Sequence, residues 1–137
     1  MGLDMYAHRI SFKPSKEVDF KDEIYNRDEQ GFLVEKEDIQ SAELFYWRKH
    51  PDLHGWMRDL YYEKGGEGDS FNCDPVILTL EDLDRLEKDI KESRLPETEG
   101  FFFGESSPER MDGDLEFIAK ARQAIQEGDT VFYDSWW

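Results

Sequence analysis

Two histidines four residues apart are the first side chains in this sequence whose spacing could do chemistry. On one helix face, His50 and His54 would present two imidazoles to a single metal ion, as in zinc-protease helices. Those helices place a glutamate, the general base, directly after the first histidine, whereas this chain has Pro51 there. Proline fits the first turn of a helix, so we expect His50 at the cap or surface and His54 half buried. We therefore expect no bound metal and no cofactor.

A single cysteine offers a possible nucleophile. Catalytic thiols are activated by a base and by positive surroundings that lower the thiol pKa. The charged neighbours of Cys73 in the sequence are Asp69 and Asp74, which act in the opposite direction. We therefore expect a buried, unreactive thiol, and a single cysteine excludes a disulfide within the chain.

A third possibility is a ligand clamp built from basic and aromatic side chains. Arg48 follows Trp47 and precedes Trp56, and a guanidinium stacked on indole rings could hold a planar anion. The simpler interpretation, which we favour, is that both tryptophans fill the core while Arg48 pairs with one of the many acids. The candidate ligand-binding residues are Arg48, His54, Trp56 and Cys73, with the segment 100–104 as one edge of the site.

The charge of the chain excludes some partners. It has 33 Asp and Glu against 17 Lys and Arg, a net charge of −16, and is repelled by phosphate backbones and anionic lipid. We expect no direct binding of nucleic acid or membrane. The acidity is either a solubilising surface or a negative face for a basic partner protein. The candidate partner-binding residues, from the acidic last third of the chain, are Glu105, Glu109, Asp112, Asp114 and Glu116.

Hydropathy predicts a cytoplasmic protein. Mean hydropathy is −0.82, and no segment approaches the run of about 18 apolar residues that a membrane span needs. The first six residues lack the basic region and apolar run of a signal peptide.

Helical periodicity predicts three main helices. The first starts at Pro51 and ends near Gly65, and the second covers 80–93 behind a capping box of Thr79 and Asp82. The third starts with Ser107 as N-cap and ends before Gly128. The residues at helical spacing that carry it are Leu115, Ile118, Ala119, Arg122 and Ile125.

Shorter apolar runs predict strands, and the whole predicts one domain of 137 residues. We expect strands in 3–10, 30–34, 75–78, 100–104 and 130–133, a loop excursion at 14–31, and a helix end or bend at 42–48. The fold class is α+β, with α/β as the alternative: a short sheet packed by about three helices. The predicted core includes Trp47, Trp56, Leu60, Leu83, Leu86, Phe102, Ile118 and Val131.

Four stretches together resemble a family of small uncharacterised proteins of bacteriophages and bacteria. They are MGLDMY at 1–6, YWRK at 46–49 with His54 and Trp56, LP at 95–96 leading into GFFFG at 100–104, and the aromatic C-terminus. After Gly104 the chain departs from that pattern, because those proteins have a tyrosine-rich acidic stretch there. The family has no established activity, so the resemblance implies a soluble, phage- or mobile-element-borne protein and supplies no catalytic residues.

Two functions follow as hypotheses. The first is an acidic, non-catalytic binding protein that docks on a basic partner protein as an inhibitor or nucleic-acid mimic. The second is a small enzyme or ligand-binding protein for a planar, nucleotide-like anion, using Arg48 and His54 and, if it is catalytic, Cys73. A deep pocket lined by these three side chains would favour the second hypothesis.

Overall fold

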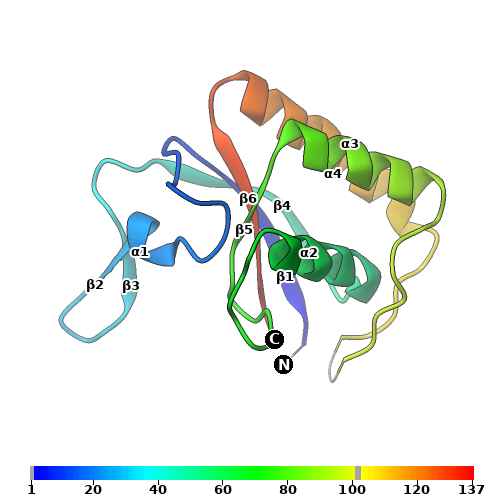
Figure 1. The fold of residues 1–137 in the computed structure, drawn as a ribbon, viewed down its shortest axis with the longest axis horizontal. Coiled ribbons are helices and arrows are strands. Elements are labelled where there is room, and N and C mark those ends of the chain that lie inside the picture. The colour runs from blue at the N-terminus through cyan, green and yellow to red at the C-terminus, as the bar shows by residue number, and fades with distance from the viewer. Residues whose placement is uncertain (1, 101–102) are drawn as a thin grey trace.

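A four-stranded sheet forms the centre of the computed structural model, which describes residues 2–100 and 103–137 (Figure 1). Its strand order is β4-β1-β6-β5, and every neighbouring pair is antiparallel. The strands are β1 (Asp4–Ile10), β4 (Ser41–Arg48), β5 (Val76–Leu78) and β6 (Thr130–Trp136). The antiparallel sheet and its separate helices confirm the α+β class.

Three helices cover one face of this sheet. They are α2 (Pro51–Glu63), α3 (Leu80–Lys91) and α4 (Arg110–Gln126), and Figure 1 shows α2 crossing in front of the strands while α3 lies beside α4. Pro51 begins α2, and Thr79 and Asp82 form a capping box at α3, both as predicted. No helix among the described residues is both long and apolar enough to cross a membrane.

The last helix differs from the prediction in its start and its buried face. It begins at Arg110, and Ser107 does not cap it: the Ser107 and Pro108 carbonyls accept bonds in a preceding turn. Phe117 packs edge-on against Trp47, with ring centroids 4.8 Å apart, and this contact turns the Phe117 side of α4 to the sheet. The buried residues are therefore Asp114, Phe117, Ile118, Ala121 and Ala124, while Ala119 is exposed.

The segment 14–31 is not a loop excursion. It contains the short helix α1 (Lys21–Ile24) and strand β2 (Tyr25–Arg27), which pairs with β3 (Leu33–Glu35) in a two-stranded sheet. Phe20 and Ile24 are buried against Phe132 and Ile77 of the main sheet. Burial of these two apolar residues helps to anchor a charged segment on the sheet.

The segment 42–48 is strand β4, not a helix end or bend. Its residues alternate, with Trp47 buried and Tyr46 and Arg48 exposed, which is the period of two of a strand. The predicted strand at 100–104 falls partly on residues 101–102, outside the described residues, and Phe103 and Gly104 belong to no strand. Phe102 of the predicted core lies outside them too, and the other seven members are buried.

The two edges of the sheet are built differently. At β5, Ile77 N donates to Glu17 O at 2.8 Å and Val18 forms a bridge with Val76, so a neighbouring segment closes this edge. At the other edge, β4 pairs with β1 along one side only in the part of the chain that the structure describes. A register shift beside Ala7 and His8 interrupts that pairing.

Candidate functional site

Strand alternation gives the main sheet two faces of different character. The face under the helices buries Met5, Ala7, Trp47 and Tyr133. The opposite side, where β4, β1 and β6 lie beyond the cover of Phe20 and Ile24, is here called the uncovered face. Its residues, assigned by register, are Asp4, Tyr6, His8, Glu43, Tyr46, Arg48, Asp134 and Trp136.

Aromatic rings occupy the middle of the uncovered face. Tyr6 lies 5.2 Å from Tyr46 and 6.0 Å from His8 between ring centroids. Tyr46 is 44% exposed and Trp136 is 67% exposed, so this face leaves a large aromatic area open to water.

Carboxylates surround these rings. Tyr46 Oη donates to Asp4 Oδ1 at 2.6 Å, and this bond is the main reason why the pKa of Tyr46 rises to about 12. Burial, then the charges of Asp4, Glu43 and Asp134, raises the pKa of Tyr6. The acids therefore make the face negative around its aromatic centre.

Asp134 is the least compensated of these carboxylates. In the described residues it has no ion pair, and its Oδ1 accepts a hydrogen bond only from Ser135 N, at 2.8 Å. Burial raises its pKa to about 6, and the hydrogen bond from Ser135 N and the charge of Lys21 offset this only in part. A second cation beside Asp134 would favour the ionised form.

The residues predicted for a ligand site do not meet. Arg48 lies on the uncovered face, where its side chain is 58% exposed and its Nε is 4.0 Å from Asp4 Oδ1. His54 is fully buried on the helix side, not half buried, and its Nδ1 lies 2.7 Å from Tyr133 Oη. Burial, then Arg58, lowers the pKa of His54 to about 3, so it is neutral. The sheet itself separates Arg48 from His54.

Trp56 and Cys73, the other two predicted ligand residues, take different roles. Trp56 is buried and donates from Nε1 to Asp89 Oδ2 at 2.8 Å, which agrees with its predicted place in the core. Cys73 is half buried rather than buried, beside the backbone of Ser135. Burial, then the charge of Asp134, raises the pKa of its thiol, which opposes nucleophilic chemistry.

The acidic set predicted for partner binding divides in two. Glu105, Glu109, Asp112 and Glu116 are exposed around the start of α4. Asp114 is only 2% exposed, because it accepts hydrogen bonds from Trp47 Nε1 at 3.0 Å and from His50 Nε2 at 2.8 Å. Asp114 therefore cannot belong to an exposed docking surface.

Asp114 belongs instead to a cluster that the sequence did not reveal. His50 is buried, not at the surface, and its Nδ1 lies 2.6 Å from Ser106 Oγ. His50, Ser106 and Asp114 line a cleft of about 320 Å³ beside Arg110. Ser106 is 56 residues and Asp114 is 64 residues from His50, so no local motif could have joined them.

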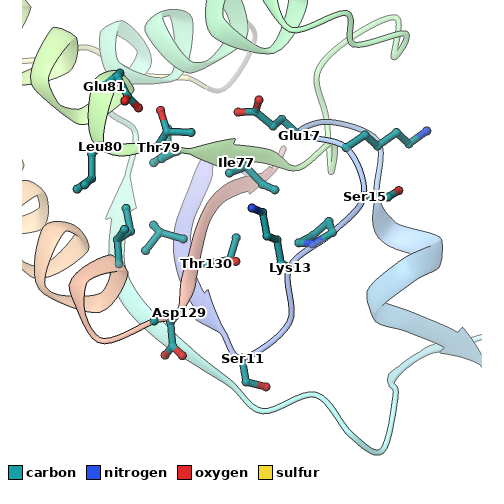
Figure 2. A pocket seen from close by; sticks show the side chains of 16 residues that line it. Ser11, Lys13, Ser15, Glu17, Ile77, Thr79, Leu80, Glu81, Asp129 and Thr130 are labelled. Carbon is teal, nitrogen blue, oxygen red and sulfur yellow. The ribbon is translucent and has the colours of Figure 1, made fainter.

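A larger cleft of about 600 Å³ lies between the end of β5, the end of α4 and the chain after β1 (Figure 2). Figure 2 shows the amine of Lys13 reaching in toward Ile77 and Thr130. Two of its carboxylates are already paired, Glu17 with Lys64 at 2.7 Å and Asp129 with Arg9 at 2.6 Å. The predicted site residues do not line this cleft.

Comparisons with protein-family models, with curated proteins and with solved structures find no match to this chain. Within the described ranges, no group of three or more His, Cys, Asp or Glu side chains is arranged to hold a metal ion. The two candidate functional sites are therefore the uncovered face and the cleft beside His50.

Proposed function

We propose that the protein binds a basic surface of a partner protein through its uncovered face. The observation that carries this proposal is the combination of exposed aromatic rings, Tyr46 and Trp136, with carboxylates on the same face of the sheet. The net charge of −16 adds long-range attraction to a basic partner.

Arginine is the side chain that this face fits best. A guanidinium stacks on tyrosine and tryptophan rings and also forms paired hydrogen bonds with carboxylates. Glu43 is exposed and has no ion pair within residues 2–100 and 103–137, while Asp4 is already held by Tyr46 and approached by Arg48. We therefore assign the partner surface as one rich in arginine.

The exposed acids around α4 are a second candidate for the same function. Glu116 already pairs with Lys120, at 3.8 Å and one helical turn away, and the set contains no aromatic residue. Carboxylates in the first turn are also favourable to a helix without any partner. These two points favour the uncovered face.

The alternative function, an enzyme or binding protein for a planar anion through Arg48 and His54, has less support. The two side chains lie on opposite sides of the sheet, so a joint pocket would need the sheet to open. The uncovered face would also disfavour an anion, because the charges of Asp4, Glu43 and Asp134 already raise the pKa of Tyr6.

Docking of this kind would make the protein an inhibitor. Basic protein surfaces commonly hold nucleic acid, and an acidic protein seated on one would exclude the phosphate backbone. The resemblance to small phage proteins is consistent with a role against host proteins. We accordingly propose nucleic-acid mimicry as the form of the inhibition.

A peptide titration tests the binding face. Isotope-labelled protein is titrated with a nona-arginine peptide and with its nona-lysine counterpart, and amide shifts are followed by NMR. We expect shifts on β1, β4 and β6, tighter binding of the arginine peptide, and affinity that falls steeply as salt rises.

Two matched charge reversals locate the site. Glu43→Lys changes the uncovered face and should weaken arginine-peptide binding about tenfold, whereas Asp112→Lys makes the same charge change on α4 and should weaken it less than about threefold. Equal losses in both variants, or shifts centred on α4, would overturn the assignment to the uncovered face. Absence of any specific shifts would overturn the proposed function.

A further inference from the structure

Three side chains beside α2 have the connectivity of a nucleophile, a base and an orienting carboxylate. Ser106 Oγ lies 2.6 Å from one ring nitrogen of His50, and Asp114 Oδ2 lies 2.8 Å from the other. Both distances are within the range in which such groups exchange or hold a proton. The cluster is independent of the uncovered face, because it lies among the helices.

The Asp114 carboxylate favours one tautomer of His50. Because a carboxylate only accepts, it places the proton of a neutral imidazole on Nε2, which leaves Nδ1 as the acceptor for the Ser106 hydroxyl, while Ser106 Oγ accepts from Asp52 N at 3.1 Å. His50 Nε2–H then donates to Asp114 Oδ2. Trp47 Nε1–H donates to the other oxygen of Asp114, at 3.0 Å, and holds that carboxylate in place.

The proton arrangement is the one that acyl-transfer catalysis requires. A neutral imidazole with its free nitrogen toward a serine can take the hydroxyl proton, and a buried carboxylate stabilises the imidazolium that forms. Here Nδ1 rather than Nε2 faces the serine, and either nitrogen can act as the base.

The cleft supplies a place for a small substrate. Its volume is about 320 Å³, and its apolar lining comes from Ile90, Leu95, Pro108 and Met111. The Arg110 guanidinium lines the same cleft and is anchored by the carbonyl oxygens of Arg48 and Lys49. Arginine has five N–H donors, so Arg110 keeps donors for an oxyanion.

We propose that Ser106 is the nucleophile of an esterase site for short, uncharged carboxylic esters. Ser106 Oγ forms a bond to the ester carbonyl carbon while His50 Nδ1 takes the hydroxyl proton. The C–O bond of the alcohol then breaks, and His50 returns the proton to the departing alcohol. Water attacks the acyl-serine by the same route, which releases the acid and restores Ser106, so that one ester and one water give one acid and one alcohol.

Asp114 is a positioning residue in this scheme. Its substitution by asparagine distinguishes a catalytic cluster from one that only stabilises the fold. In Asp114→Asn, the new amide Nδ2–H₂ would face His50 Nε2 and favour a proton on Nδ1 instead. That tautomer cannot accept the Ser106 proton, although the volume and the Trp47 contact are kept. A purely structural cluster has no reason to lose serine reactivity through this change.

The experiment treats the whole protein with a fluorophosphonate reagent, which loses fluoride as the serine oxygen bonds to phosphorus. Intact mass and peptide mapping then locate the adduct, and p-nitrophenyl acetate hydrolysis is measured in parallel. We expect one adduct on Ser106 in the wild type, none in Ser106→Ala, and at least about 100-fold lower kcat in Asp114→Asn with little change in KM.

Ser70→Ala is the matched control, because Ser70 is an exposed serine that does not line this cleft. It should label at the wild-type rate. Circular dichroism checks that each variant is folded, since Ser106 also bonds the first turn of α2. Folded wild type without an adduct on Ser106, or Asp114→Asn labelled as fast as wild type, would overturn the proposal.

Discussion

The two faces of the main sheet are made by the same strands and have opposite characters. On the covered face, Trp47 and Tyr133 are buried and their polar atoms are bonded to Asp114 and His54. On the uncovered face, Tyr46 and Trp136 are exposed, and Asp134 is a carboxylate without an ion pair in the described residues. The first face stabilises the fold, whereas the second is the face through which we propose that the protein binds a partner.

The stabilising role of the covered face is tested most directly at Trp47. Trp47→Ala removes a buried ring from the covered face and leaves Asp114 with one donor fewer, so unfolding free energy should fall by about 3–5 kcal/mol. Urea denaturation followed by circular dichroism measures this loss. A loss below about 1 kcal/mol would mean that the covered face does not stabilise the fold.

Lowering the pH should reduce the free energy of unfolding because of His54, which is buried on the helix side of the sheet. Burial, then Arg58, lowers its pKa to about 3, while the unfolded side chain titrates near 6.5. As pH falls from about 6.5 toward 3, His54 is protonated in the unfolded chain but stays neutral in the folded protein. The free energy of unfolding therefore falls by about 1.4 kcal/mol per pH unit.

His54→Phe isolates this contribution. The variant loses the bond to Tyr133 Oη and should be less stable than wild type at pH 7. The difference in unfolding free energy between the two proteins should narrow by about 2 kcal/mol between pH 6.5 and 4.5, because only the wild type has this unfavourable protonation. Parallel urea curves at the two pH values give this difference, and a constant gap would contradict a neutral buried His54.

Asp134, on the uncovered face, should make the free energy of unfolding depend on pH in the opposite direction to His54. Burial raises its pKa to about 6, above the ordinary value near 3.9, so the folded protein holds this proton more tightly than the unfolded chain. Ionised Asp134 therefore destabilises the fold above about pH 6, and this penalty disappears below about pH 4. Asp134→Asn should be more stable than wild type by roughly 1–2 kcal/mol at pH 7.5 and equal to it at pH 4, measured by urea unfolding.

The smallest effect is expected at Trp136. Trp136→Ala removes a ring that is 67% exposed, so the free energy of unfolding should change by no more than about 0.5 kcal/mol. Arginine-peptide affinity should nevertheless fall, since the ring is part of the proposed binding face. A loss of stability as large as that of Trp47→Ala would show that Trp136 is a structural residue.

The sequence predicted the elements well where one local pattern decides the structure. Pro51 and the Thr79–Asp82 box mark real helix starts, and the alternating segment 3–10 is a strand. It failed at 42–48 and 14–31, where pairing with β1 and burial of Phe20 depend on distant residues.

The functional sites were less predictable for the same reason. The face on which Arg48 lies is set by its pairing with Asp4, far away in the chain, and not by its neighbours Trp47 and Lys49. Ser106 and Asp114 resemble ordinary polar loop and helix residues until α2 brings His50 between them. Only the three-dimensional arrangement distinguishes such residues from solvent-exposed ones.

The unequal edges of the sheet limit how copies of this chain can associate. The edge at β5 is closed by Glu17 and Val18, while β4 keeps one unpaired side in the described part of the chain. A sheet with one open edge can accept a single extra strand. If two copies joined through β4, the open edge of each main sheet would be used, so strand pairing through the main sheet would end at a dimer.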